Sequence, residues 1–205
     1  MNLSKKEHWE KVFATKEQNE VSWYQPKPQT SIDFFVENSI PKDAKVIDVG
    51  GGDSYLIDNL LEMGYTNLFL LDISENAINK IKNRLGGKVK NVTFIVSDVL
   101  DFQSEISFDV WHDRASFHFL TSDEEIATYQ NLVSNSVAEN GLLFLGSFSE
   151  SGPLKCSGLE IVQYSEAKFK KIFGSCFAIL NCFNENHATP FDTIQNFIFC
   201  SLKKK

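Results

Sequence analysis

The sequence lacks the marks of secreted, membrane-spanning and disulfide-framed proteins. Its four cysteines form no C-x-x-C pair, which favours reduced thiols over a disulfide framework. No apolar run approaches the roughly 20 residues that a membrane-spanning helix needs. The charged first ten residues, which include Trp9, contain no apolar segment of the kind found in signal peptides. We therefore expect a cytoplasmic protein with no membrane partner.

Basic residues are also scarce relative to acidic ones. The 205 residues include 20 Lys and Arg against 27 Asp and Glu, which gives a formal net charge of −7. Neutralising phosphates requires a basic face, so we expect no nucleic-acid partner. The Lys203–Lys205 run at the end of the sequence is interpreted as a solvated tail. The four histidines show no H-E-x-x-H spacing, and we expect no metal site.

Apolar content and length indicate one folded domain. Hydrophobic residues make up 42% of the chain, and 18 of its residues are Phe, which needs no hydrogen-bond partner when buried. A chain of this length can bury most of its surface in a single core. We interpret residues 1–205 as one domain, a monomer or weak dimer, with an N-terminal arm over residues 1–30 and an α/β core over residues 31–202.

Short apolar runs alternate with helical patterns along the core. Buried strands alternating with helices predict a doubly wound, mostly parallel α/β sheet. The expected strands cover residues 45–49, 67–72, 92–96, 108–111 and 141–145. Two further strands, 176–183 and 194–202, follow without an intervening helix, so we expect them to pair antiparallel. The loop between them would contain Asn184, Asn186, His187 and Pro190.

The arm shows its own pattern before this alternation begins. Residues 4–15 are typical of a short amphipathic helix with Trp9, Val12 and Phe13 on one side. Pro26 and Pro28 then interrupt an extended segment, and we expect Thr30 or Ser31 to cap the next helix.

A glycine turn at residues 50–52 follows the first strand and precedes a helix. Glycines let the backbone turn sharply and let a ligand approach closely, and the helix start directs free N–H groups at that ligand. The dinucleotide fingerprint G-x-G-x-x-G would need a third glycine where this chain has Tyr55. No P-loop sequence is present either. The turn therefore favours a ligand without a diphosphate.

Three acidic residues accompany this turn, each near the end of a predicted strand. Asp48 precedes Gly50 by two residues, Asp72 closes the second strand, and Asp98 ends the third. A carboxylate at the position of Asp72 can bind ribose hydroxyls, and Asp98 can accept the amine of an adenine. Ile73 and Val99 supply apolar faces for the ring. Together these side chains suit a positively charged nucleoside without phosphates.

With these motifs the sequence resembles class I S-adenosylmethionine-dependent methyltransferases over residues 31–202. The resemblance implies a Rossmann-like, seven-stranded sheet of order 3-2-1-4-5-7-6 whose last strand is antiparallel. It implies S-adenosylmethionine as cofactor, with S-adenosylhomocysteine as product. The residues expected to bind it are Asp48, Gly50, Gly51, Gly52, Asp72, Ile73, Asp98, Val99, Trp23 and Arg114.

The segment Trp23-Tyr24-Gln25 is similar to a subgroup that includes small bacterial methyltransferases and lysine methyltransferases. The eukaryotic lysine enzymes of that subgroup have Asp-Lys-Gly-Thr where this chain has Asp113 to Ser116. This difference favours a small-molecule acceptor with an O, N or S nucleophile. Alternatives are a protein lysine acceptor or a non-catalytic module that binds S-adenosylmethionine, with an NAD-dependent oxidoreductase as a less favoured third.

Residues 111–119, at the end of the fourth strand, are the expected place for the acceptor, because ligands of open α/β sheets bind beyond the carboxyl ends of strands. We expect His112 or Asp113 to line the methionine end of the cofactor. His118 or Asp113 would take the acceptor's proton. Alternatively, His118 is simply packed between two phenylalanines, and Arg114 binds a carboxylate of donor or acceptor or makes a structural ion pair.

Two segments are expected to enclose the acceptor. Trp23 and Tyr24 are candidates for a lid, since aromatic faces attract cations, or for a plain hydrophobic clasp. The loop over residues 147–159 is long for a simple connection, so we expect it to wall the acceptor pocket, with Cys156 as a pocket residue.

Overall fold

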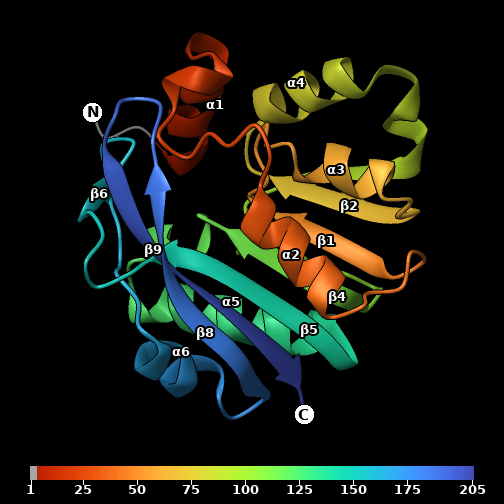
Figure 1. Ribbon diagram of the computed structural model, residues 1–205, viewed down its shortest axis with the longest axis vertical. Coiled ribbons are helices and arrows are strands. Elements are labelled where there is room, and N and C mark those ends of the chain that lie inside the picture. The colour runs from red at the N-terminus through yellow and green to blue at the C-terminus, as the bar shows by residue number, and fades with distance from the viewer. Residues whose placement is uncertain (1–3) are drawn as a thin grey trace.

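The computed structural model describes residues 4–205, and its centre is one twisted sheet (Figure 1). The first five strands run parallel: β1 (Lys45–Val49), β2 (Asn67–Asp72), β3 (Val92–Val96), β4 (Phe108–Arg114) and β5 (Val137–Phe148). β8 (Phe177–Ala188) and β9 (Ile194–Lys204) complete the sheet. Its order is β3-β2-β1-β4-β5-β9-β8, and β9 is antiparallel to both neighbours. The predicted fold class and strand order are confirmed.

Helices cover both faces of this sheet (Figure 1). One face packs on α2 (Gln29–Glu37), α3 (Leu56–Glu62) and α4 (Glu75–Leu85), and the other on α5 (Asp123–Ser136) and α6 (Glu166–Phe173). Strand side chains alternate between the two cores, so Val46 belongs to the first and Ile47 to the second. This alternation explains why the central strands are apolar at consecutive positions.

Shorter elements fill the connections. Three are 3₁₀ helices: η1 (Gln18–Glu20), η2 (Gly86–Asn91) and η3 (Phe117–Phe119). The expected loop after β5 contains a small hairpin of β6 (Lys155–Cys156) and β7 (Leu159–Glu160). None of the helices in residues 4–205 has both the length and the apolar character to cross a bilayer.

The N-terminal helix α1 (Lys5–Thr15) lies against the start of α4. Its Glu10 carboxylate accepts hydrogen bonds from the Ser74 hydroxyl at 2.9 Å and from the backbone N–H groups of Glu75 and Asn76 at 2.8 and 3.0 Å. A carboxylate at a helix N-terminus satisfies free N–H groups and interacts favourably with the helix dipole. Lys5 also pairs with Glu125 of α5. The arm is thus bound at two places. The expected arm includes residues 1–3, which lie outside the described part.

Four expectations need correction. The Lys203–Lys205 run is not a solvated tail, because β9 extends to Lys204, whose ammonium group donates to the carbonyls of Ser134 and Val137 at 2.7 Å. β8 continues to Ala188, so Asn184, Asn186 and His187 lie in a strand and not in a loop, because pairing with β9 extends to Ile194. Thr30 and Ser31 lie inside α2, whose cap position is Pro28. The structure joins Cys182 to Cys200 in a disulfide, where we expected reduced thiols. The two cysteines are opposite each other in the β8–β9 register, with Cα atoms 4.2 Å apart, a proximity that their spacing of 18 residues does not reveal.

A buried hydrogen-bond chain connects α5 to the end of β4. The Trp111 indole N–H donates to the Tyr129 hydroxyl at 3.0 Å, and that hydroxyl donates to the Asp113 carboxylate at 2.6 Å. The other oxygen of Asp113 accepts the backbone N–H groups of Ser116 and Phe117 at 3.0 and 3.1 Å. These hydrogen bonds therefore fix the turn that follows β4.

We predict that Tyr129→Phe lowers the free energy of unfolding by about 1–3 kcal/mol, because it removes one partner each from buried Asp113 and Trp111. Urea denaturation measures the change. Tyr164→Phe is the matched control, since the Tyr164 hydroxyl is buried but has no hydrogen-bond partner within residues 4–205. Equal losses in the two variants would contradict this assignment.

Candidate functional site

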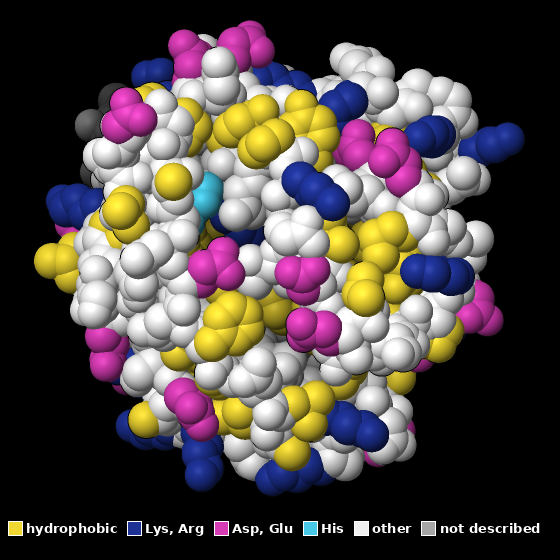
Figure 2. All heavy atoms as spheres, in the orientation of Figure 1, with side chains coloured by type: hydrophobic (Ala, Val, Ile, Leu, Met, Phe, Trp, Pro, Cys, Tyr) yellow, Lys and Arg dark blue, Asp and Glu magenta, His cyan; other side chains and the backbone are white. Residues whose placement is uncertain are grey.

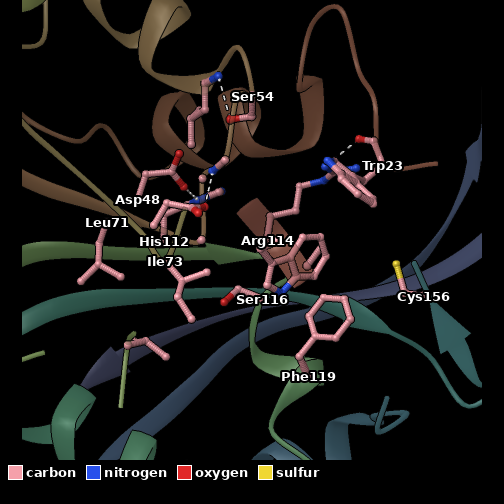
Figure 3. A pocket seen from close by; sticks show the side chains of 18 of the residues that line it. Trp23, Asp48, Ser54, Leu71, Ile73, His112, Arg114, Ser116, Phe119 and Cys156 are labelled. Carbon is pink, nitrogen blue, oxygen red and sulfur yellow. Dashed lines mark hydrogen bonds and ion pairs between the residues drawn. The ribbon is translucent and has the colours of Figure 1, made fainter. Parts of the chain in front are cut away.

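A pocket of about 1120 Å³, part of it open to solvent, lies at the carboxyl ends of β1 to β4. One half, here called the acidic half, contains Asp48, Gly50, Gly51, Gly52, Leu71, Asp72, Ile73, Ser97, Asp98 and Val99. The other, called the aromatic half, contains Trp9, Trp23, Arg114, Phe119, Phe148, Cys156 and Phe197. Figure 3 shows Leu71 and Asp48 at one side, Cys156 at the other, and Arg114 and Phe119 between them.

The glycine turn leaves no room for side chains. Gly50 and Gly52 have φ of +62° and +55°, a region that favours glycine. A Cβ on Gly50 would lie 2.5 Å from Cβ of Ser116, and one on Gly51 would lie 2.5 Å from Oδ2 of Asp48. The turn therefore depends on glycine for both its conformation and its packing against β1 and the residues after β4.

Asp72 is buried beside this turn. Its Oδ2 accepts the N–H of Gly52 at 2.8 Å, and its Oδ1 accepts the N–H of Ser74 at the same distance. Burial raises the pKa of Asp72 to about 7, although the two backbone bonds oppose that shift. Each oxygen retains a lone pair, so the carboxylate can still accept two ligand hydroxyls.

Asp98, Ile73 and Val99 also reach the acidic half, as the sequence predicted. Asp98 Oδ1 accepts the N–H of Leu100 at 3.0 Å, which holds the turn after β3. The two apolar side chains follow β2 and β3 directly and lie in the same half of the pocket. The sheet thus brings together three acids that are far apart in sequence.

Asp48 and His112 form a buried pair on neighbouring strands. Oδ1 of Asp48 lies 2.7 Å from Nδ1 of His112, whose Nε2 lies 2.8 Å from the Ser31 hydroxyl. Oδ2 of Asp48 is buried and has no hydrogen-bond partner among residues 4–205. That oxygen can accept a ligand N–H group. Ser31 was expected as a helix cap, and its role here had no signal in the sequence beyond its type.

Arg114 lies at the end of β4 in the aromatic half. Its Nη1 donates to the Trp23 carbonyl at 3.2 Å, so the arm contacts it directly. Nε and Nη2 are buried and have no acceptor within the described chain. Burial lowers the pKa of Arg114 to about 10, which still leaves the guanidinium charged at neutral pH.

The structure does not bring Asp113 or His118 to the pocket. Side chains alternate along β4, so His112 and Arg114 face the pocket while Asp113 faces the opposite core. Asp113 holds the turn after β4, and burial raises its pKa to about 6. His118 is fully buried. The centre of its ring lies 4.5 Å from that of Phe119 and 4.6 Å from that of Phe148. Burial lowers its pKa to about 3, so it is neutral at pH 7. Neither position supports the expected proton transfer.

The inner side of α1 supplies pocket residues that sequence reasoning missed. Trp9 and Phe13 line the pocket, and a Cβ on Gly52 would lie 2.9 Å from the Phe13 ring. Their spacing of four residues indicated a shared helix face, but not which surface that face contacts. Trp23 lines the pocket as expected, whereas Tyr24 packs edge-on against Tyr55 outside it.

Comparisons with known proteins agree on the family. The model of a family described as "Methyltransferase domain" matches residues 40–188. The chain is 27% identical over 136 residues to the mouse (Mus musculus) eEF1A lysine and N-terminal methyltransferase, a match that covers 66% of this chain and 19% of the relative. It is 23% identical over 118 residues to malonyl-[acyl-carrier protein] O-methyltransferase 2 of Ilyobacter polytropus, covering 57% of this chain and 44% of the relative. The chain thus spans about a fifth of the first of these relatives.

Solved structures share the fold over almost the whole chain. A methyltransferase from Anabaena variabilis matches with a TM-score of 0.76 and 12% identity, covering 100% of this chain and 96% of that one. The N-methyltransferase NodS of Bradyrhizobium japonicum, in complex with S-adenosylhomocysteine, matches with a TM-score of 0.69 and 12% identity, covering 97% of both chains. Since the family model matches well over half of the sequence, the chain belongs to the methyltransferase domain family.

Proposed function

We propose that this methyltransferase methylates an O, N or S nucleophile of a small molecule. The observation that carries the proposal is the aromatic half of the pocket, which is lined by residues of the arm, of the β6–β7 hairpin and of the sheet. The ring of Trp9 lies 5.1 Å from that of Phe119 and 5.7 Å from that of Trp23, measured between ring centres. Such a concave, mostly apolar space suits a small ligand. On the face shown in Figure 2, acidic, basic and apolar side chains are interspersed, whereas a lysine-bearing protein would favour an open acidic groove.

The residues of the acidic half fit S-adenosylmethionine. A Cβ at any of the three glycines of the turn would collide with neighbouring atoms, so the backbone there stays open to close approach by a ligand. The Oδ2 atom of Asp48, which lacks a hydrogen-bond partner in residues 4–205, suits the amino group of the methionine part. In this proposal Asp72 binds the ribose hydroxyls, Asp98 accepts the adenine amine, and Ile73 and Val99 contact the ring. His112 then orients Asp48 and does not act on the acceptor.

When bound, S-adenosylmethionine would supply the methyl group. Its S–CH₃ bond would break as the bond to the acceptor's nucleophile forms, with the electron pair left on sulfur and the nucleophile's proton released to solvent. Catalysis then rests on alignment of the two reacting atoms about 3–3.5 Å apart. Residues 1–30 act as the arm of a single domain, in which Trp9 and Trp23 line the pocket and would offer aromatic faces to a cationic sulfur.

A protein lysine acceptor is the second candidate. It is supported by the curated relatives, which include eEF1A lysine methyltransferases at 27% identity over 136 residues. The chain is also similar to an O-methyltransferase named for malonyl-[acyl-carrier protein]. The two candidates differ in the size of the molecule that receives the methyl group, and this difference can be measured.

We predict that methyl-labelled S-adenosylmethionine transfers its label to a low-mass product when the enzyme is incubated with the fraction of a cell extract below 3 kDa. The protein fraction of the same extract serves as the parallel substrate. Asp72→Asn is the control for enzyme-dependent transfer. Label recovered on lysines of the protein fraction alone would contradict the small-molecule proposal and favour the second candidate.

We predict that Asp72→Asn weakens binding of S-adenosylhomocysteine about 10- to 100-fold, because charged hydrogen bonds to the ribose are each worth about 1.5–3 kcal/mol. Isothermal titration calorimetry measures this change. Asp53→Asn is the matched control: Asp53 is also buried, but its side chain does not line the pocket, so its variant should bind normally.

We predict that wild-type affinity for S-adenosylhomocysteine falls several-fold as the pH decreases from 8 to 6. Asp72 has a raised pKa of about 7 in the free protein, and ribose binding favours its charged form. Below this pKa, binding must therefore displace a proton, which weakens it as the pH falls. The Asp72→Asn variant should lack this dependence, and an equal slope in both proteins would remove Asp72 as the titrating group.

A further inference from the structure

Arg114 extends away from the acidic half of the pocket. From the end of β4 its side chain crosses β5, where its Cγ lies 3.3 Å from the place that a Cβ on Gly146 would take. Its guanidinium carbon then lies 5.5 Å from the centre of the Phe197 ring on β9. β5 and β9 are on the opposite side of β4 from β1, β2 and β3. The guanidinium is therefore directed into the aromatic half (Figure 3).

The protein leaves this guanidinium incompletely paired. Nη1 donates to the Trp23 carbonyl, while Nε and Nη2 are buried and have no acceptor within residues 4–205. No ion pair joins Arg114 to a carboxylate in the described chain. The carboxylate of Glu185, which contributes to its electrostatic environment, accepts the Thr30 hydroxyl. Buried charged donors without acceptors are unfavourable, so this arrangement calls for an anionic ligand.

The two free groups have the geometry for a planar anion. Nε–H and one N–H of Nη2 form the side-on fork of a guanidinium, which binds both oxygens of a carboxylate. Glu185 and Asp48 both affect the charge of Arg114, and their repulsion disfavours a doubly charged phosphate more than a singly charged carboxylate. Phe119, Phe148 and Phe197 line the same pocket, and the centre of the Phe197 ring lies 5.5 Å from the guanidinium carbon.

We propose that Arg114 binds a carboxylate of the methyl acceptor, which is an aromatic or otherwise apolar carboxylic acid. This inference rests on the proposed small-molecule function. It assigns Arg114 to acceptor recognition and not to the carboxylate of S-adenosylmethionine. The carboxylate is held by the arginine and the apolar body fills the aromatic half, so the nucleophile is a different group of the same molecule.

The test uses the full chain saturated with S-adenosylhomocysteine and a set of aryl carboxylates, such as hydroxybenzoates and naphthoates, with their matched carboxamides. Ligand-observed NMR competition measures the dissociation constants. We expect the best carboxylates to bind at least tenfold more tightly than their amides. Arg114→Gln should reduce this preference to within twofold while changing S-adenosylhomocysteine affinity less than threefold, and Arg114→Lys should give an intermediate preference.

Lys5 provides the matched control, because it also lines the pocket but is paired with Glu125. Lys5→Gln should retain the carboxylate preference, and its loss in that variant would overturn the assignment to Arg114. The proposal is also overturned if the wild type shows no preference for carboxylates over carboxamides, whether it binds both series or neither. This comparison does not depend on the folding of any variant. If Arg114→Gln weakens S-adenosylhomocysteine binding as much as it weakens carboxylate binding, the arginine would instead be assigned to the donor. Failure of the wild type to bind S-adenosylhomocysteine would instead contradict the proposed function.

Discussion

Carboxylates can be buried at the ends of β1 and β2 only where the backbone and neighbouring side chains donate hydrogen bonds to them. Asp72 obtains them from the N–H groups of Gly52 and Ser74, and Asp48 obtains one from His112. The glycine turn must therefore pass close to both acids, and the parallel order β2-β1-β4 must hold. The shape of the acidic half follows from these requirements.

The aromatic half is built differently, from elements that are far apart in the chain. α1 contributes Trp9, the β4 end contributes Arg114 and Phe119, and β9 contributes Phe197. The acidic half thus depends on the central parallel strands, whereas the aromatic half depends on the arm and on the antiparallel end of the sheet. Differences in substrate between related enzymes can arise in this half without disturbing the glycine turn.

Hydrophobic periodicity and the glycine turn are local signals, and they were sufficient to predict the strands and the location of the strand-end acids. The strand order followed only from the resemblance to class I methyltransferases. The sequence was insufficient for Asp113 and His118, whose orientation depends on how β4 alternates and on the η3 turn that follows it. The disulfide and the length of β8 depend on strand register, which spacing alone does not determine. The role of α1 depends on packing against α4, a contact between residues more than 60 positions apart.

The contact of Glu10 with α4 links ligand exchange to helix stability. The side chain satisfies N–H groups that the first turn of α4 cannot satisfy itself, and α4 begins immediately after Asp72 and Ile73. If the product nucleoside leaves by displacing α1, the first turn of α4 loses the Glu10 carboxylate when α1 moves. Release would then break the three hydrogen bonds that the Glu10 carboxylate accepts, so a half-buried glutamate outside the pocket could influence turnover without touching either substrate.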